Sequence, residues 1–401
     1  MTASKHPAGA ISVLSLDGGG SFAGVLAIAL GRLYGPTTEG REILRKFDLA
    51  AANSGGSIVL AALLANFSPR EIAGFYSNAA TVRKMYCPRW CSVFKNTFLR
   101  PLFPPYSSTG KRDALAQLLD HRRLQGDRQP SAIPLDQWPS VLGTDLKLLI
   151  AAYDYDSERA AFFRSTWRGK GAESERRSRV PLIDAVHAST QAPILYYAKP
   201  AVVDGRRYWD GGLAGYNNPV LAAVIEAMSE YPQRAQAVRV LSIGTGAIMH
   251  ARSADGAPEP FARRASTGLW AQLRKVAGAV LADPPSAATF HAHMALERAR
   301  LPELPTTSRV VRLSPLIRPW RDRERTWHPP RGLSTTEFTN LTEMAGDTMR
   351  RADLALIEKV ANLWLDGFVE NEPVLIGSSP SFGIGDSTFE QAHAHWRALQ
   401  G

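Results

Sequence analysis

The chain has 401 residues, and its 47 Lys and Arg against 37 Asp and Glu give a formal charge of +10 at pH 7. Apolar residues make up 45% and charged residues 21%, a composition that is typical of globular proteins and excludes a disordered or fibrous chain. The excess of positive charge is compatible with a nucleic-acid partner, with an anionic membrane surface, or with solubility alone.

The cysteines and the apolar runs narrow the class of protein further. Two cysteines, Cys87 and Cys91, exclude a disulfide scaffold, and their spacing is poor for a structural zinc site, which needs four ligands. The first seven residues lack the apolar core of a secretory signal. Apolar runs such as residues 58–65 are shorter than the roughly 20 residues that span a bilayer. We therefore expect a cytoplasmic protein.

The first part of the chain alternates short buried strands with helices. An apolar run at residues 10–16 ends at Asp17-Gly18-Gly19-Gly20 and precedes a helical pattern over residues 24–33. A second run at residues 47–52 ends at Asn53-Ser54-Gly55-Gly56-Ser57 and precedes an apolar helix that continues to about residue 66. Strand, glycine-rich turn and helix, twice over, predict an α/β fold with a mostly parallel central sheet flanked by helices.

The rest of the chain continues this pattern without an internal repeat. Strands are predicted at residues 146–153, 160–164, 201–203, 206–209 and 237–243, and helices at residues 180–190, 218–231, 261–300 and 334–365. We expect an N-terminal extension (residues 1–9), one α/β domain (residues 10–367), and a tail rich in Pro, Gly and Ser (residues 368–401) that is appended to the core.

Ser54 lies between a predicted buried strand and an apolar helix, which is the arrangement of a nucleophile elbow. The turn of an elbow is so sharp that bulky side chains two positions before and after the serine would collide. The small residues Ala52 and Gly56 occupy those positions. The helix N-terminus favours negative charge beside the hydroxyl. The same pattern also fits a serine that only caps a helix, so its meaning depends on partners elsewhere in the chain.

Two other loops could supply such partners. Gly18, Gly19 and Gly20 follow the first strand and offer backbone N–H groups either to the phosphates of a dinucleotide or to the oxyanion of an acyl-transfer reaction. The dinucleotide interpretation lacks the acidic residue that normally follows about 20 positions later. Asp210 precedes two glycines, Gly211 and Gly212, which by themselves would indicate only a turn.

The order of these motifs and the residues within them resemble the motifs of the patatin-like phospholipase family. Residues 17–20 resemble the start of the family's first motif, Asp-Gly-Gly-Gly-x-Arg-Gly, and residues 47–56 resemble its serine elbow. Residues 210–219 resemble its Asp-Gly-Gly loop with Asn-Asn-Pro after it. Residues 188–193 and 241–246 add to the likeness, which covers residues 10 to about 250 and, less distinctly, continues to 367.

The resemblance implies a three-layer patatin-like fold and a catalytic Ser–Asp dyad without histidine. Ser54 would be the nucleophile and Asp210 the base that accepts its proton. The amides of Gly18, Gly19 and Gly20 would hold the tetrahedral oxyanion. Ala52, Gly56, Gly211 and Gly212 would support the elbow and the loop. The family needs no metal and no cofactor, so a chelator should leave the rate unchanged.

Two departures from the family pattern concern details of the site. The first motif continues Ser21-Phe22-Ala23-Gly24, so the family's arginine is absent and the last glycine comes one residue late, which leaves open which amides line the oxyanion hole. Ala52 replaces a glycine at the elbow. Neither departure removes a catalytic side chain. His187, the histidine nearest to a matched motif, is expected to be structural.

The surface charge suggests where such an enzyme would act. Residues 86–112 interleave aromatic and basic side chains, as either a segment that contacts a membrane or a lid packed on the core would do, and two further basic stretches occupy residues 159–179 and 318–331. No nucleic-acid-binding motif accompanies them, so we expect no nucleic-acid partner.

We expect a cytoplasmic, peripherally membrane-associated acyl hydrolase that cleaves phospholipids or lysophospholipids. Control by an activating factor, as in some bacterial members of the family, is compatible with the resemblance. The alternatives are a catalytically degenerate lipid- or protein-binding module on the same scaffold, and a general carboxylesterase.

Overall fold

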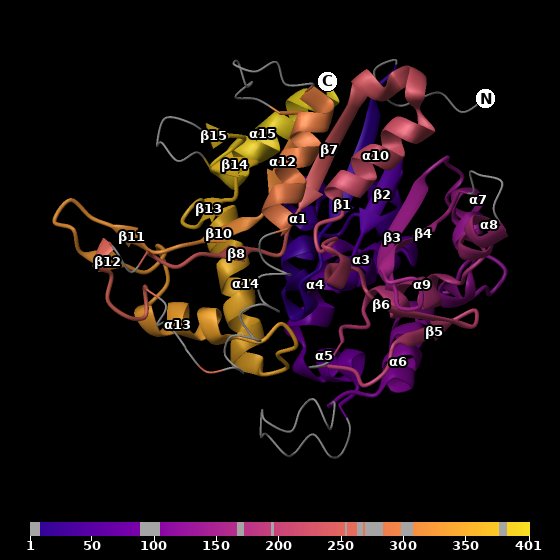
Figure 1. Cartoon of the computed structure of the whole chain (residues 1–401), viewed down its shortest axis with the longest axis horizontal. Helices are drawn as coiled ribbons and strands as arrows, with labels where there is room; N and C mark the ends of the chain where they lie inside the picture. Colours follow the sequence, from indigo (N-terminus) through magenta and orange to yellow (C-terminus); the bar gives the residue numbers. More distant parts are fainter. Residues whose placement is uncertain are drawn as a thin grey trace.

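A single large sheet organises the part of the chain that the computed structural model describes, namely residues 9–88, 105–166, 172–193, 196–252, 255–262, 268, 284–297, 308–376 and 383–401. Within these residues the sheet has eight strands in the order β5-β6-β3-β2-β1-β7-β9, with β4 paired to β3 (Figure 1). The strands β1 (Ile11–Leu16), β2 (Leu49–Ala52), β3 (Lys147–Asp154), β7 (Val238–Ile243) and β9 (Val310–Leu313) run parallel. The strands β4 (Arg159–Arg164), β5 (Ala201–Val203) and β6 (Arg206–Asp210) form antiparallel pairs.

Helices cover both faces of this sheet, which gives the three layers expected from the sequence. Alternate residues of β1 point to opposite faces. Leu14 and Leu16 enter one core cluster with α1 (Gly24–Tyr34), α3 (Ser54–Leu64) and α9 (Leu182–Ser189). Ile11 and Val13 enter a second cluster with α10 (Val220–Glu230) and α12 (Pro284–Glu297). The remaining helices are α2 (Gly40–Leu44), α4 (Pro69–Ser77), α5 (Ala79–Tyr86), α6 (Ser108–Asp120), α7 (Trp138–Leu142), α8 (Ala172–Ser178), α13 (Thr335–Glu343), α14 (Arg351–Leu365) and α15 (Phe389–Gln400).

Short strands complete the list. In a small sheet, β10 (Pro315–Ile317) lies between β8 (Ala247–Ile248) and β13 (Glu370–Asn371) and pairs with both. Two further antiparallel pairs join β11 (Trp320–Arg321) to β12 (Trp327–His328) and β14 (Leu375–Ile376) to β15 (Gly383–Ile384). In the described residues no helix is both long enough and apolar enough to cross a bilayer.

The prediction of one helix over residues 334–365 is wrong, because the chain breaks between α13 and α14. Gly346, a poor helix former, lies in the break. Its carbonyl oxygen accepts the amide of Ser21 at 2.7 Å and the hydroxyl of Tyr86 at 3.1 Å. The break therefore places the α13–α14 junction against the glycine-rich loop instead of continuing a helix past it.

The expectation that residues 368–401 are appended to the core is also wrong. Phe389, Ala392 and Trp396 of α15 are buried in the larger core cluster. The indole of Trp396 stacks on Phe47 with ring centroids 6.0 Å apart, and its Nε1 donates to the Tyr34 hydroxyl at 2.9 Å. The Pro, Gly and Ser content of this segment concealed a short amphipathic helix that closes the core.

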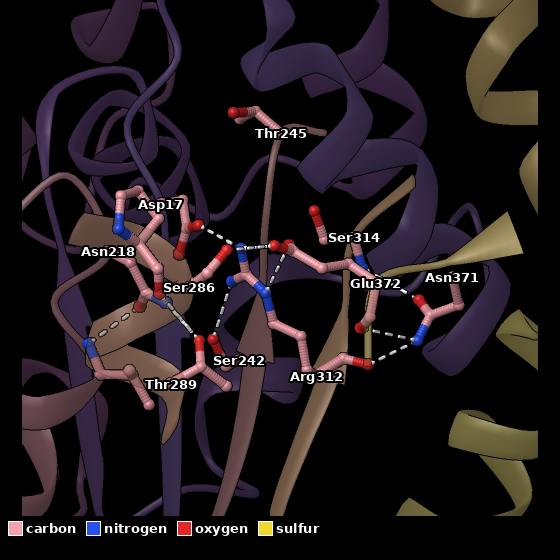
Figure 2. Close-up of polar contacts among 12 residues, drawn as sticks. Asp17, Asn218, Ser242, Thr245, Ser286, Thr289, Arg312, Ser314, Asn371 and Glu372 are labelled. Atoms are coloured by element: carbon pink, nitrogen blue, oxygen red, sulfur yellow. Dashed lines mark hydrogen bonds and ion pairs between the residues drawn. The ribbon is translucent and has the colours of Figure 1, made fainter. Parts of the chain in front are cut away.

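A buried arginine joins the C-terminal segment to the glycine-rich loop. Arg312 of β9 is 4% exposed, and its Nη2 lies 2.8 Å from Oδ2 of Asp17 and 3.0 Å from Oε2 of Glu372 (Figure 2). Its Nη1 donates to the hydroxyl of Ser242 at 3.0 Å. Burial raises the pKa of Asp17 to about 6, although the neighbouring guanidinium lowers it. Asp17 directly precedes Gly18, so this cluster fixes the start of the loop.

Replacing Arg312 by methionine should destabilise the fold strongly. The change leaves two buried carboxylates without their counter-ion, and breaking a buried pair in this way typically costs about 3 to 5 kcal/mol of unfolding free energy. Equilibrium urea unfolding of Arg312→Met measures the loss.

The matched control is Arg318→Met, because Arg318 pairs with Glu370 at 2.7 Å but both side chains are exposed. Such a surface pair is worth at most about 1 kcal/mol. Equal losses in the two variants would contradict the role assigned to the buried cluster.

Candidate active site

The register of the sheet brings Ser54 and Asp210 to the same place. Along β3, Ile150 is paired with Ala52 at the end of β2, and Ala152 is paired with Asp210 at the end of β6. A strand has two edges, and β4 pairs with one edge of β3 over residues 149–154. β2 and β6 therefore both pair with the opposite edge of β3, one after the other. The residue two positions beyond Ala52 therefore lies level with Asp210.

Ser54 has the backbone of a nucleophile elbow. It is the first residue of α3 and has a φ of 46°, in the left-handed region that residues other than glycine rarely adopt. Strain of this kind at a serine between a strand and a helix is the signature of the elbow turn. Ser54 is partly exposed, whereas Asn53 before it and Gly55 after it are buried.

Two of the predicted supporting glycines are required by close backbone contacts. A Cβ at Gly56 would lie 2.5 Å from the carbonyl oxygen of Leu16 and 2.6 Å from that of Asp17. A Cβ at Gly211 would lie 2.8 Å from the backbone carbonyl carbon of Ala151 and 2.5 Å from Oδ1 of Asn53. The elbow, the glycine-rich loop and the Asp-Gly-Gly loop are therefore packed against each other with no room for a methyl group at these positions.

Asp210 is a buried carboxylate with defined hydrogen-bond donors. It is 7% exposed, and its Oδ1 accepts the amide of Gly212 at 2.8 Å and Nδ2 of Asn53 at 3.1 Å. Burial raises the pKa of Asp210 above its ordinary value, and hydrogen bonds from the Ser54 side chain, from Gly212 and from Asn53 partly offset this rise. A carboxylate with a raised pKa is a better proton acceptor than a free one.

Asn53 and Ser189 belong to the site although the sequence did not single them out for a role. The hydroxyl of Ser189 accepts the amide of Ser54 at 2.9 Å and lies 3.4 Å from Oδ1 of Asn53. Together they orient the elbow toward Asp210. Ser189 belongs to residues 188–193, which are part of the family likeness, and its hydrogen bond helps to position the backbone of Ser54.

The glycine-rich loop is held at both ends and leaves two amides available. The amide of Gly18 donates to the carbonyl of Asn217 at 2.8 Å, and the carbonyl of Gly18 accepts the hydroxyl of Thr245 at 2.8 Å. Among the described residues, no acceptor is found for the amides of Gly19 and Gly20. A Cβ at Gly55 would lie 3.1 Å from the nitrogen of Gly20, so that amide is adjacent to the elbow.

His187 and possible metal ligands lie apart from this arrangement. The Nε2 atom of His187 is 3.5 Å from the hydroxyl of Ser108, and burial lowers the pKa of His187 to about 2, so its imidazole is neutral. In the part of the chain that the structure describes, no group of three or more His, Cys, Asp or Glu side chains is arranged to hold a metal ion.

Comparisons with known proteins agree with the motifs. The family model for patatin-like phospholipases matches residues 14–224, more than half of the chain. A cGAMP-activated phospholipase of Vibrio cholerae serotype O1 is 25% identical over 255 residues, which cover 60% of this chain and 66%, slightly less than two thirds, of that relative.

Two solved structures are also similar, at low levels. VipD from Legionella pneumophila has 11% identity and a TM-score of 0.33, over 88% of this chain and 68% of VipD. The type III effector ExoU has 11% identity and a TM-score of 0.26, over 73% of this chain and 54% of ExoU. On the strength of the family match, which spans the glycine-rich loop, the elbow and the Asp-Gly-Gly loop, this chain belongs to the patatin-like phospholipase family.

Proposed function

We propose that this protein is a lipid acyl hydrolase of the phospholipase A or lysophospholipase type, with Ser54 as nucleophile and Asp210 as base. The observation that supports this most directly is the buried carboxylate of Asp210, held by Asn53 and Gly212 beside a serine with strained elbow geometry. A helix cap would need neither the strain nor the buried acid.

In the proposed reaction, Asp210 takes the proton of the Ser54 hydroxyl while Oγ attacks the acyl carbonyl carbon. A serine hydroxyl is a weak nucleophile without such a base. The raised pKa of Asp210 suits this proton transfer, because it brings the carboxylate closer to the pH at which the enzyme works.

The negative charge of the tetrahedral intermediate would be held by the amides of Gly19 and Gly20. Gly18, the third residue expected in the oxyanion hole, contributes less directly, because its amide already donates to Asn217. The two available amides belong to a loop fixed by Asp17, Thr245 and Gly346, so they need little reorganisation during the reaction.

Collapse of the intermediate would pass the proton from Asp210 to the departing alcohol or lysophospholipid and leave an acyl group on Ser54. A water molecule, deprotonated by Asp210, would then release the fatty acid and regenerate the serine. These steps use side chains and amides of this chain alone, and no metal or cofactor takes part in them.

Peripheral contact with an anionic membrane is part of the proposal. Most of the aromatic and basic segment at residues 86–112 lies outside the described residues. Support comes from the third basic stretch, where Trp320 of the β11–β12 hairpin is 37% exposed and the Arg331 guanidinium lies over its ring at 5.4 Å. Exposed indole next to arginine suits the boundary between acyl chains and phosphate headgroups. The cGAMP-activated relative makes a cyclic dinucleotide a candidate activator.

Substitution of either dyad residue should abolish release of fatty acid. Ser54→Ala removes the nucleophile and Asp210→Asn removes the base, so we expect losses of at least about a thousandfold in kcat from each. Fatty acid released from phospholipid vesicles, with and without cGAMP, is the measurement, and Ser77→Ala, on an exposed serine of α4, is the control.

A serine-directed fluorophosphonate separates this function from a degenerate binding module, which would not label at Ser54.

His187→Ala should keep its activity, since the imidazole is neutral and contacts Ser108. Undiminished activity in Ser54→Ala or Asp210→Asn would contradict the proposed mechanism.

Anionic vesicles should be better substrates than zwitterionic ones of the same acyl composition. The net charge of +10 favours the anionic surface, and added salt should reduce the difference because it screens that attraction. Co-sedimentation and initial rates at two salt concentrations measure the effect, and Ser54→Ala should sediment as well as the wild type. Faster turnover of a monomeric soluble ester than of either vesicle would favour a general carboxylesterase.

A further inference from the structure

A lysine side chain lies fully inside the protein beside the candidate dyad. Lys111 of α6 is 2% exposed, and its Nζ donates to the carbonyl of His187 at 3.1 Å, to Oγ1 of Thr190 at 2.9 Å and to Oε1 of Gln191 at 2.7 Å. The ring of Tyr197 covers it, with Nζ 4.4 Å from the centroid.

These three partners require three N–H donors. The His187 carbonyl can only accept, and the Thr190 hydroxyl uses its own proton on the carbonyl of Val186 at 2.8 Å. The Gln191 amide is oriented by its Nε2, which donates to the carbonyl of Lys199 at 2.7 Å, so its oxygen faces the lysine. A neutral amine has two N–H groups and would aim its lone pair at one of these oxygens. The pattern therefore fits a charged ammonium.

A buried ammonium needs a compensating negative charge. Among the described residues, no carboxylate lies within salt-bridge distance of Lys111, and the charge that acts on it is the carboxylate of Asp210. Burial lowers the pKa of Lys111 well below its usual value, and this carboxylate works in the opposite direction. The effect is mutual, because the ammonium lowers the pKa of Asp210.

A chain of hydrogen bonds through Gln191 also links Lys111 to Asp210. The amide of Asp210 donates to the backbone carbonyl of Gln191 at 3.0 Å, and the side chain of Gln191 is held by Lys111 and by the hydroxyl of Ser108 at 2.9 Å. Lys111 therefore holds the side chain of Gln191, whose backbone carbonyl accepts the amide of Asp210.

The other titratable groups around the ammonium are accounted for within the described residues. On α6 and α9, Arg112 is paired with Asp184 at 2.6 Å, and burial keeps His187 neutral. Burial also raises the pKa of the Tyr197 phenol, which stays protonated. Farther out, Asp347 accepts the hydroxyl of Tyr106.

We propose that Lys111 is a positioning residue for the Ser54–Asp210 pair: its buried ammonium keeps the Asp210 carboxylate ionised and, through Gln191, holds it level with Ser54. This inference rests on the proposed function for its catalytic consequence, although the pairing of the two charges can be tested without it.

The first test is the pH dependence of Ser54 labelling by a fluorophosphonate in the wild type and in Lys111→Met. Asp210 acts as a base only when it is ionised, and loss of the ammonium raises its pKa. In a plot of labelling rate against pH, the pH below which the rate falls should therefore move up by about one unit or more in Lys111→Met. Below that pH the variant should label roughly tenfold more slowly than the wild type, and at higher pH its rate should recover. Lys84→Met, on an exposed lysine of α5, should leave that pH unchanged.

A purely structural lysine would lower the rate at every pH without shifting the pH below which the rate falls, and that result in a folded Lys111→Met protein overturns the proposal. If the wild type labels no more than Ser54→Ala, the proposed function fails instead. The stability measurement below still tests the pairing of charges.

The second test is a double-mutant cycle in urea unfolding with Asp210→Asn. Neutralising Asp210 leaves the ammonium uncompensated, so Asp210→Asn should be less stable than the wild type and the double variant should regain part of the loss. Additive losses overturn the proposal. Failure of both Lys111→Met and the double variant to fold would show that Lys111 serves packing and would overturn it too.

Discussion

The close approach of three loops at one edge of β3 is the constraint on which the site depends. Because β2 and β6 share that edge end to end, Ser54 and Asp210 meet without either lying on a long excursion from the sheet. The approach requires that Gly56 and Gly211 carry no side chain, since a Cβ would lie about 2.5 Å from neighbouring backbone or side-chain oxygen at each. The proposed acyl-transfer chemistry thus depends on strand register, and the packing around Ser54 sustains the strain of its elbow.

Two buried cations flank this junction, and their surroundings differ. Arg312 has two carboxylates within hydrogen-bond distance, so its charge is compensated locally and its effect is on the stability of the loop that begins at Asp17. Lys111 has three uncharged acceptors and compensates a carboxylate that it does not touch. Because the counter-ion of Lys111 is the proposed base, removal of Lys111 should affect the proposed reaction, whereas removal of Arg312 should affect the stability of the fold.

The sequence predicted the parts of this molecule that depend on local pattern. Strand, glycine turn and helix at Ser54 follow from the alternation of apolar and small residues, and the strand and helix lie within a few residues of the predicted bounds. Lys111 carried no such signal, because it stands among other polar residues of α6 and only tertiary packing buries it. The break at Gly346 and the burial of Trp396 were missed for the same reason: each depends on contacts with residues at least 260 positions away in the chain.

Those distant contacts also bear on what counts as the catalytic domain. The family is recognised over residues 14–224, yet β7, the direct neighbour of β1, begins at Val238. Thr245, Arg312 and Gly346, which hold the glycine-rich loop, all lie beyond the matched region. A chain ending at residue 224 would expose the edge of β1 and leave Asp17 buried without its guanidinium. The part of the chain that must fold to position Ser54, the proposed nucleophile, therefore includes the C-terminal half, down to the helix that packs Trp396 against Phe47.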